Sequence, residues 1–155
     1  TMKKLQEVSR SIEINATPDA CYAVLCDMEG YRSWFKHVKD LDVKKVGDDC
    51  RPESILFTFD LLIKKGLKIV LSYRYDDAEK ILYFQSGGGD VTRASGNYHF
   101  RPLPGDRTLF VFSLQVDFGM MMPDTIVEFL SGRVLDDFVA MVRDECERRA
   151  GLYRG

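Results

Sequence analysis

A run of alternating segments between residues 55 and 118 is the sequence feature that most constrains the fold. The segments are "ILFTFDLLI" (55–63), "LKIVLSYRY" (67–75), "ILYFQS" (81–86), "TRASGNYHFRP" (92–102) and "TLFVFSLQVDF" (108–118). The breaks between them hold Lys65-Gly66, "DDAEK", "GGGD" and "LPGD", which are turn signals. Connections this short join antiparallel neighbours, so the pattern predicts a meander of strands.

The residues before the meander predict two more strands with short helices between them. "VSRSIEI" (8–14) alternates like a strand, and "LDVKKV" (41–46) does the same. Thr17, which is followed by proline, is typical of the start of a helix, so we expect a helix over 18–26. A second helical piece is expected over residues 31–37.

The last part of the chain predicts one long amphipathic helix from Pro123 to about Ala150. Its apolar residues recur at spacings of three and four, which places them on one stripe. They are Val127, Leu130, Val134, Phe138 and Met141. Only the sheet is large enough to cover this stripe. We therefore expect a single α+β domain over residues 1–155, with a curved antiparallel sheet of six to seven strands around the helix.

Composition excludes several classes of protein. The 155 residues are 45% hydrophobic and carry a net charge of −2, so neither intrinsic disorder nor nucleic-acid binding is expected. The four cysteines form no CxxC pair, which favours free thiols in a reducing cytoplasm. The opening "TMKKLQEV" lacks the apolar core of a signal peptide. No apolar run reaches the length of a membrane span, so any membrane contact would be peripheral. The expected location is cytoplasmic.

Alternation along the strands predicts which side chains face the helix. Five rows share this inward face. They are Phe57, Phe59 and Leu61; Ile69, Leu71, Tyr73 and Tyr75; Ile81, Tyr83 and Gln85; Tyr98 and Phe100; and Phe110, Phe112, Leu114, Val116 and Phe118. In the third row, Leu82 and Phe84 leave the choice of face open. Arg93 could face in or out.

The sequence holds no constellation typical of catalysis or metal binding. His37 and His99 are the only histidines, and neither has the spacing of a metal site. No G-x-S-x-G is present, and "GGGD" lacks the lysine of a phosphate loop. Paired acids such as Asp48-Asp49 fall in turns, where solvated carboxylates are usual. We therefore expect no catalytic residues, no metal and no cofactor.

Three stretches resemble a known superfamily. The opening "SRSIEINATPDACYAVLCDMEGYRSWFKHVKDLDV" resembles that of the START-like, helix-grip (SRPBCC) superfamily, with Ala16-Thr17-Pro18 before a short helix and then Asp27, Glu29, Tyr31 and Trp34 in a D-x-E-x-Y-x-x-W pattern. "GNYHFRPLPGDRTLFVFSLQVDFG" and the closing "MVRDECERRAGLYRG" resemble the coenzyme Q-binding and polyketide cyclase/dehydrase branch. Tyr98 stands where that branch often has tryptophan.

The resemblance implies a mainly apolar cavity between the long helix and the sheet, filled by a hydrophobic small-molecule ligand. Tyr31, Trp34 and Phe35 are expected to form a lid beside the cavity. The candidate ligand-binding residues come from this lid, the inward rows, "FGMMMPD" (118–124) and the helix stripe. They are Tyr31, Trp34, Phe35, Phe57, Phe59, Leu71, Tyr73, Tyr75, Tyr83, Gln85, Tyr98, Phe112, Leu114, Met122, Val127, Leu130 and Val134. Within the lid, we expect Trp34 to pack as structure and Tyr31 or Phe35 to meet ligand.

Three functions are compatible with this resemblance. The leading hypothesis is binding, transfer or chaperoning of a lipid, a polyprenyl quinone or a similar molecule without catalysis. The second is a polyketide aromatase/cyclase or dehydratase, which predicts a perturbed ionisable residue deep in the pocket. The third is a ribosome-associated interaction module, which predicts a coherent basic patch. The identity of the ligand and the oligomeric state stay open at this point.

Overall fold

A computed structural model describes residues 5–61, 64–89, 93–117 and 123–151 of the chain. The first half of these residues forms β1 (Leu5–Ile14), α1 (Pro18–Cys26), the 3₁₀ turn η1 (Met28–Gly30), α2 (Tyr31–Trp34), β2 (Val38–Val46) and β3 (Pro52–Leu61). The second half forms β4 (Lys64–Asp76), β5 (Ile81–Gly89), β6 (Arg93–Leu103), β7 (Arg107–Asp117), α3 (Asp124–Ser131) and α4 (Arg133–Arg149). The predicted order of strand, short helices, strands and C-terminal helix is confirmed.

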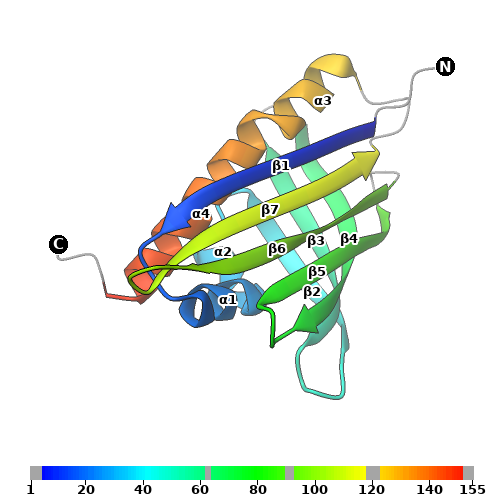
Figure 1. Cartoon of the computed structure of the whole chain (residues 1–155). Coiled ribbons are helices and arrows are strands. Elements are labelled where there is room, and N and C mark those ends of the chain that lie inside the picture. The colour runs from blue at the N-terminus through cyan, green and yellow to red at the C-terminus, as the bar shows by residue number, and fades with distance from the viewer. Residues whose placement is uncertain (1–4, 62–63, 90–92, 118–122, 152–155) are drawn as a thin grey trace.

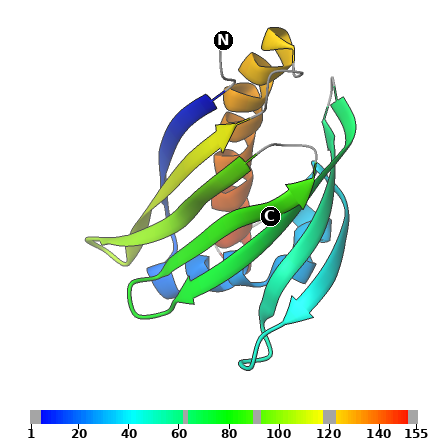
Figure 2. The ribbon, with the colours of Figure 1, turned by 90° about the vertical axis from the view of Figure 1, so that its right-hand side faces the viewer.

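The described strands form one antiparallel sheet in the order β1-β7-β6-β5-β4-β3-β2. β3 to β7 are the predicted meander. The two strands predicted before it form the edges of the sheet: β2 pairs with β3, and β1 pairs with β7, where Ile12 lies opposite Phe110. Figure 1 shows α3 and α4 running along one face of this sheet, and Figure 2 shows the sheet curving around them. This is the helix-grip arrangement that the sequence predicted.

The first helix begins where the sequence predicts. The side-chain oxygen of Thr17 accepts a hydrogen bond from the backbone nitrogen of Ala20 at 3.2 Å, and Pro18 occupies the first helical turn. Such a cap satisfies a backbone donor that has no partner inside the helix. α1 and α2 lie across one end of the sheet (Figure 1). They therefore close that end of the space between helix and sheet.

The predicted C-terminal helix is present over the expected residues, and it is interrupted at Gly132. This residue has φ −113° and ψ −86°, which lie outside the helical region. A β-carbon there would lie 3.2 Å from the carbonyl oxygen of Glu128, so glycine suits the tight turn. Two helices, α3 and α4, therefore replace one.

The stripe by which α4 faces the sheet also differs from the prediction. Val134 and Met141 are only partly buried, although the predicted stripe included both. The fully buried apolar residues of α4 are Leu135, Phe138, Val139, Val142 and Cys146. Because the helix starts again after Gly132, its buried stripe is centred about one residue later than an unbroken helix would place it.

The inward face predicted for β5 is wrong. Leu82 and Phe84 are buried, whereas Gln85 is exposed and Tyr83 is half-buried beneath the guanidinium of Arg74, which lies 3.9 Å from the ring centroid. In the antiparallel register, Leu82 pairs with Tyr98 and Phe84 pairs with Gly96. Directly paired residues share a face, so the inward Tyr98 places Leu82 and Phe84 inside the fold.

Gly96 is required by the close approach of its neighbours. A β-carbon at this position would collide with the backbone carbonyl of Ser113 and would lie 2.8 Å from Cζ of Phe84. We expect Gly96→Ala to lower the free energy of unfolding by about 3 kcal/mol, because strand β7 or the Phe84 ring must move. Chemical denaturation measures this change. In the matched control Gly87→Ala, the nearest atom lies 4.0 Å away, so an equal loss there would contradict the explanation.

Candidate ligand cavity

An apolar cavity of about 170 Å³ lies between α4 and the inner face of the sheet. Side chains from β3 to β7, from α4 and from the segment before β2 form its wall. They are Phe35, His37, Phe59, Leu61, Leu67, Ile69, Leu71, Phe84, Ala94, Tyr98, Phe112, Leu114, Val116, Val134, Leu135 and Phe138. Only His37 and Tyr98 among them carry polar side-chain atoms. The wall therefore favours apolar contents.

The cavity occupies only one half of the space between helix and sheet. Leu61 and Val116 place it toward the end of the sheet where β3 and β7 finish. The other half is filled, because the rings of Phe57, Phe100 and Phe110 are at most 1% exposed. Phe57 packs on Tyr31 of α2, Phe100 packs on Tyr22 of α1, and Phe110 stacks on Phe100. Large aromatic side chains thus fill the closed end and leave room at the opposite end.

Phe138 of α4 joins the walls of the cavity. Its ring centroid lies 4.9 Å from that of Phe35, 5.2 Å from that of Phe112 and 5.6 Å from that of Tyr98. Phe35 belongs to the predicted lid, and the other two belong to the sheet. Aromatic pairs at such separations are individually stabilising, so the lid, the helix and the sheet hold one another in place around the cavity.

Seven of the candidate ligand-binding residues line the cavity, and their contact with a ligand stays a prediction. They are Phe35, Phe59, Leu71, Tyr98, Phe112, Leu114 and Val134. The candidate list missed Phe84 because the face of β5 was read the wrong way. It missed His37 because a single histidine outside a strand carries no periodic signal. Phe138 belonged to the predicted helix stripe, which is the signal that could have added it to the list.

The lid residue Tyr31 is part of the core and does not line the cavity. Tyr31 is 2% exposed, and its hydroxyl donates a hydrogen bond to the carbonyl of Leu25. Its ring stacks on that of Phe57, with the two ring centroids 6.1 Å apart. Trp34 packs on Phe35 with centroids 5.7 Å apart, as predicted for a structural residue. Of the three lid aromatics, Phe35 is the one that reaches the cavity.

The other candidates whose side chains the structure describes lie away from the cavity wall. Phe57, Tyr73 and Val127 are buried outside it, and the hydroxyl of Tyr75 donates to the carbonyl of Pro52. Tyr83 and Gln85 line a groove on the outer face of the sheet. Met122 lies outside the described residues, and so does the side chain of Leu130.

His37 contributes a buried nitrogen without a partner. Its Nε2 makes no hydrogen bond, and the nearest acidic oxygen, Oδ2 of Asp137 on α4, is 4.0 Å away. The pKa of His37 is lowered from its ordinary value of 6.5, mainly because burial disfavours the charged ring, and the charge of Lys36 acts in the same direction. The imidazole is therefore neutral at pH 7.

Tyr98 contributes a hydroxyl from the centre of β6. Tyr98 is 8% exposed, and its ring packs against those of Phe84, Phe112 and Phe138. Burial alone raises the pKa of this phenol, so it stays protonated. A protonated phenol can donate a hydrogen bond.

Polar clusters elsewhere in the described chain serve the fold. Arg51 forms ion pairs of 2.8 Å with both Asp49 and Asp77, and the hydroxyl of Tyr22 donates to Asp77 at 2.8 Å. These contacts tie α1 to the turn after β4. Among the described residues, no three His, Cys, Asp or Glu side chains come together as a metal site.

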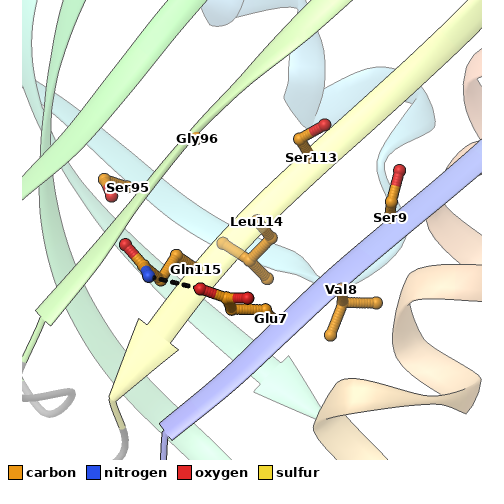
Figure 3. A pocket seen from close by; sticks show the side chains of 8 residues that line it. All are labelled: Glu7, Val8, Ser9, Ser95, Gly96, Ser113, Leu114 and Gln115. Atoms are coloured by element: carbon orange, nitrogen blue, oxygen red, sulfur yellow. Dashed lines mark hydrogen bonds between the residues drawn. The ribbon is translucent and has the colours of Figure 1, made fainter.

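A second hollow lies on the outer face of the sheet over β1, β7 and β6, and Figure 3 shows the residues around it. Its volume is about 450 Å³, larger than that of the inner cavity. It is a shallow depression above short side chains such as Ser9, Ser95 and Ser113, and Gln115 donates to Glu7 across it at 2.8 Å. Water can hydrogen-bond to the polar side chains of such an open surface, and the surface does not enclose a ligand. The smaller inner cavity is therefore the candidate site.

Comparison with known proteins agrees with this geometry. The profile of the family described as polyketide cyclase/dehydrase and lipid transport matches residues 14–143. A START superfamily protein from Mycobacterium smegmatis superposes with a TM-score of 0.81 at 22% identity, over 92% of this chain and 97% of that one. The Zhui aromatase/cyclase from Streptomyces sp. R1128 gives 0.80 at 19% identity, over 94% and 96%.

More distant structures share the same fold. A norcoclaurine synthase from Thalictrum flavum superposes with a TM-score of 0.70 at 14% identity, over 97% of this chain and 99% of that one. These likenesses confirm the predicted START-like fold. No protein of curated function matches the chain at the sequence level. No helix in the described part of the chain is long and apolar enough to cross a bilayer.

The lowered pKa of His37 makes stability depend on pH. The unfolded chain binds this proton near pH 6.5, whereas the folded chain binds it only at lower pH. Below pH 6.5 the unfolded state therefore holds more protons, and the free energy of unfolding falls as pH falls. We expect His37→Leu to make this decline shallower in denaturation curves between pH 7.5 and 5.5. An NMR titration that places the pKa of His37 at or above 6.5 would contradict the assignment.

Proposed function

Since the chain belongs to the family of polyketide cyclase/dehydrase and lipid transport proteins, we propose that it binds a hydrophobic small molecule in the cavity between α4 and the sheet. The observation that supports this proposal is the apolar composition of the cavity wall. A space of about 170 Å³ is surrounded by aliphatic and aromatic side chains, and only His37 and Tyr98 interrupt it with polar atoms. Ligand sites in proteins have this character, with few polar groups that fix orientation.

The volume sets the size of what fits inside. A protein cavity of about 150 Å³ lined by Leu, Ile and Phe takes up a single benzene ring. The cavity of about 170 Å³ therefore holds one ring with small substituents. A lipid or a polyprenyl quinone would place only one end, such as the quinone ring, in this space, and the rest would extend past the end where β3 and β7 finish.

Filling the cavity tests the proposal. Ala94 is 3% exposed and lines the wall, so Ala94→Leu adds apolar volume inside the space without adding charge. We expect this variant to lower the affinity for toluene at least tenfold, because the added side chain occupies the room of the ring. Shifts of methyl NMR signals of Leu71 and Val134 during a toluene titration measure the binding.

The matched control is Ala23→Leu, which makes the same change at an exposed position of α1. It should bind toluene as the wild type does. Equal affinity of wild type and Ala94→Leu would contradict binding in this cavity. Absence of toluene binding to the wild type would contradict the proposed function itself.

A further inference from the structure

We propose that the cavity binds an aromatic ring that bears an alkyl chain. The ring lies against the aromatic part of the wall, and the chain points toward the end of the sheet where β3 and β7 finish, which is the outer end of the cavity. The inference rests on the proposed function, because it names the class of ligand and its orientation in the same cavity. Three observations support it: a band of rings in the wall, the position of this band away from the outer end, and the aliphatic side chains at the outer end.

The first observation is a connected band of phenyl and phenol rings in the wall. These rings belong to Phe35, Phe59, Phe84, Tyr98, Phe112 and Phe138. The ring centroid of Phe35 lies 5.9 Å from that of Phe59, and the centroid of Tyr98 lies 5.1 Å from that of Phe84. Phe138 joins these two pairs through its contacts with Phe35 and Tyr98. A ligand in the cavity therefore lies beside rings from the lid, the sheet and the helix.

The rings of this band are tilted relative to one another. The interplanar angle is 65° between Phe112 and Phe138, 43° between Tyr98 and Phe138, and 32° between Phe84 and Tyr98. Aromatic pairs prefer tilted or offset arrangements, in which the positive edge of one ring meets the negative face of another. A further ring can form such contacts with the band, whereas a saturated group of the same size cannot. The band therefore favours an aromatic ring over an alkyl group.

The second observation is the position of the band, which the register of β6 and β7 defines. Tyr98 lies opposite Phe112, and Ala94 lies opposite Val116. Because β6 begins at the outer end and β7 finishes there, the aromatic pair is the inner one. Four residues of a strand span about 13 Å, so the two pairs lie in different parts of the wall.

β3 and α4 show the same order of ring and aliphatic side chain. On β3, Phe59 comes before Leu61, and the strand finishes at the outer end. α4 starts at the outer end and runs toward α1 (Figure 1), so Val134 lies nearer the outer end than Phe138 does. β4 is the exception, because all its wall residues are aliphatic: Leu67, Ile69 and Leu71. Four of the elements around the cavity thus place a ring inward of an aliphatic side chain.

The third observation is the kind of side chain at the outer end. Ala94 has the smallest side chain in the wall, and Leu114 and Val116 follow Phe112 toward this end. An alkyl chain attracts its neighbours only through non-directional burial and dispersion, so aliphatic side chains suit it as well as rings would. A ligand therefore gains most when its ring meets the band and its chain meets the outer end.

The orientation of bound n-propylbenzene tests this inference in the wild-type protein. Intermolecular NOEs between the unlabelled ligand and uniformly ¹³C-labelled protein measure which protein protons lie near each end of the ligand. We expect the ring protons of the ligand to contact the rings of Phe112 and Phe138, and its terminal methyl group to contact the methyl groups of Ala94 and Val116. The reverse pattern, or ring protons that contact both pairs equally, would overturn the inference.

Toluene and methylcyclohexane measure the preference for an aromatic ring, because they differ chiefly in aromaticity. Their dissociation constants are measured by methyl NMR on wild type and on Phe112→Leu. The affinity of toluene relative to methylcyclohexane should fall about fivefold in this variant, because one aromatic contact is lost. Phe57→Leu is the matched control, since it makes the same change at a buried ring that does not line the cavity, and it should keep the wild-type ratio.

The failure of this inference is distinguishable from the failure of the proposed function. An unchanged ratio of toluene to methylcyclohexane in Phe112→Leu would overturn the inference, but toluene bound to wild type would leave the proposed function intact. If wild type bound none of the three probes, both would fail. The NOE measurement needs no variant, so it decides the orientation even where Phe112→Leu does not fold.

Discussion

The packing of α4 against the inner face of the sheet is the interaction on which the rest of the structure depends. Phe138 meets aromatic rings from the lid and from β6 and β7, so one side chain of the helix contacts each wall of the cavity. Burial of a phenylalanine stabilises a fold by about 2 to 3 kcal/mol, and this gain exists only when the sheet curves far enough to reach the helix. The packing of α4 against the sheet therefore accounts both for the curvature of the sheet and for the position of the cavity.

The uneven distribution of aromatic side chains explains why a cavity remains. At the end closed by α1 and α2, Phe57, Phe100 and Phe110 fill the space between helix and sheet. At the other end the wall includes Ala94, Leu67 and Val116, whose shorter side chains leave a void. An interior of globular proteins is normally packed without such voids. A void that survives with an apolar wall is therefore better explained by a ligand than by poor packing.

Local patterns predicted most of the fold but not every face. Turn residues and alternation gave the meander, and the cap at Thr17 gave the start of α1. On β5, residues 81–84 are all apolar or aromatic, so alternation could not decide which of Tyr83 and Phe84 points inward. The register with Gly96 and Tyr98 decides it, and register is a property of two strands rather than one.

The surroundings of His37 show more clearly that local sequence patterns do not predict tertiary contacts. His37 owes its neutral, unpaired Nε2 to three segments: its own loop, the backbone of Asp60 at the end of β3, and Asp137 on α4. These residues are far apart in the sequence, and none has a spacing that marks it as functional. Their contacts arise only because the curved sheet brings β3 and α4 to the same end of the cavity. The protonation state of His37 depends on these tertiary contacts. It can therefore be derived from the fold and not from the sequence pattern alone.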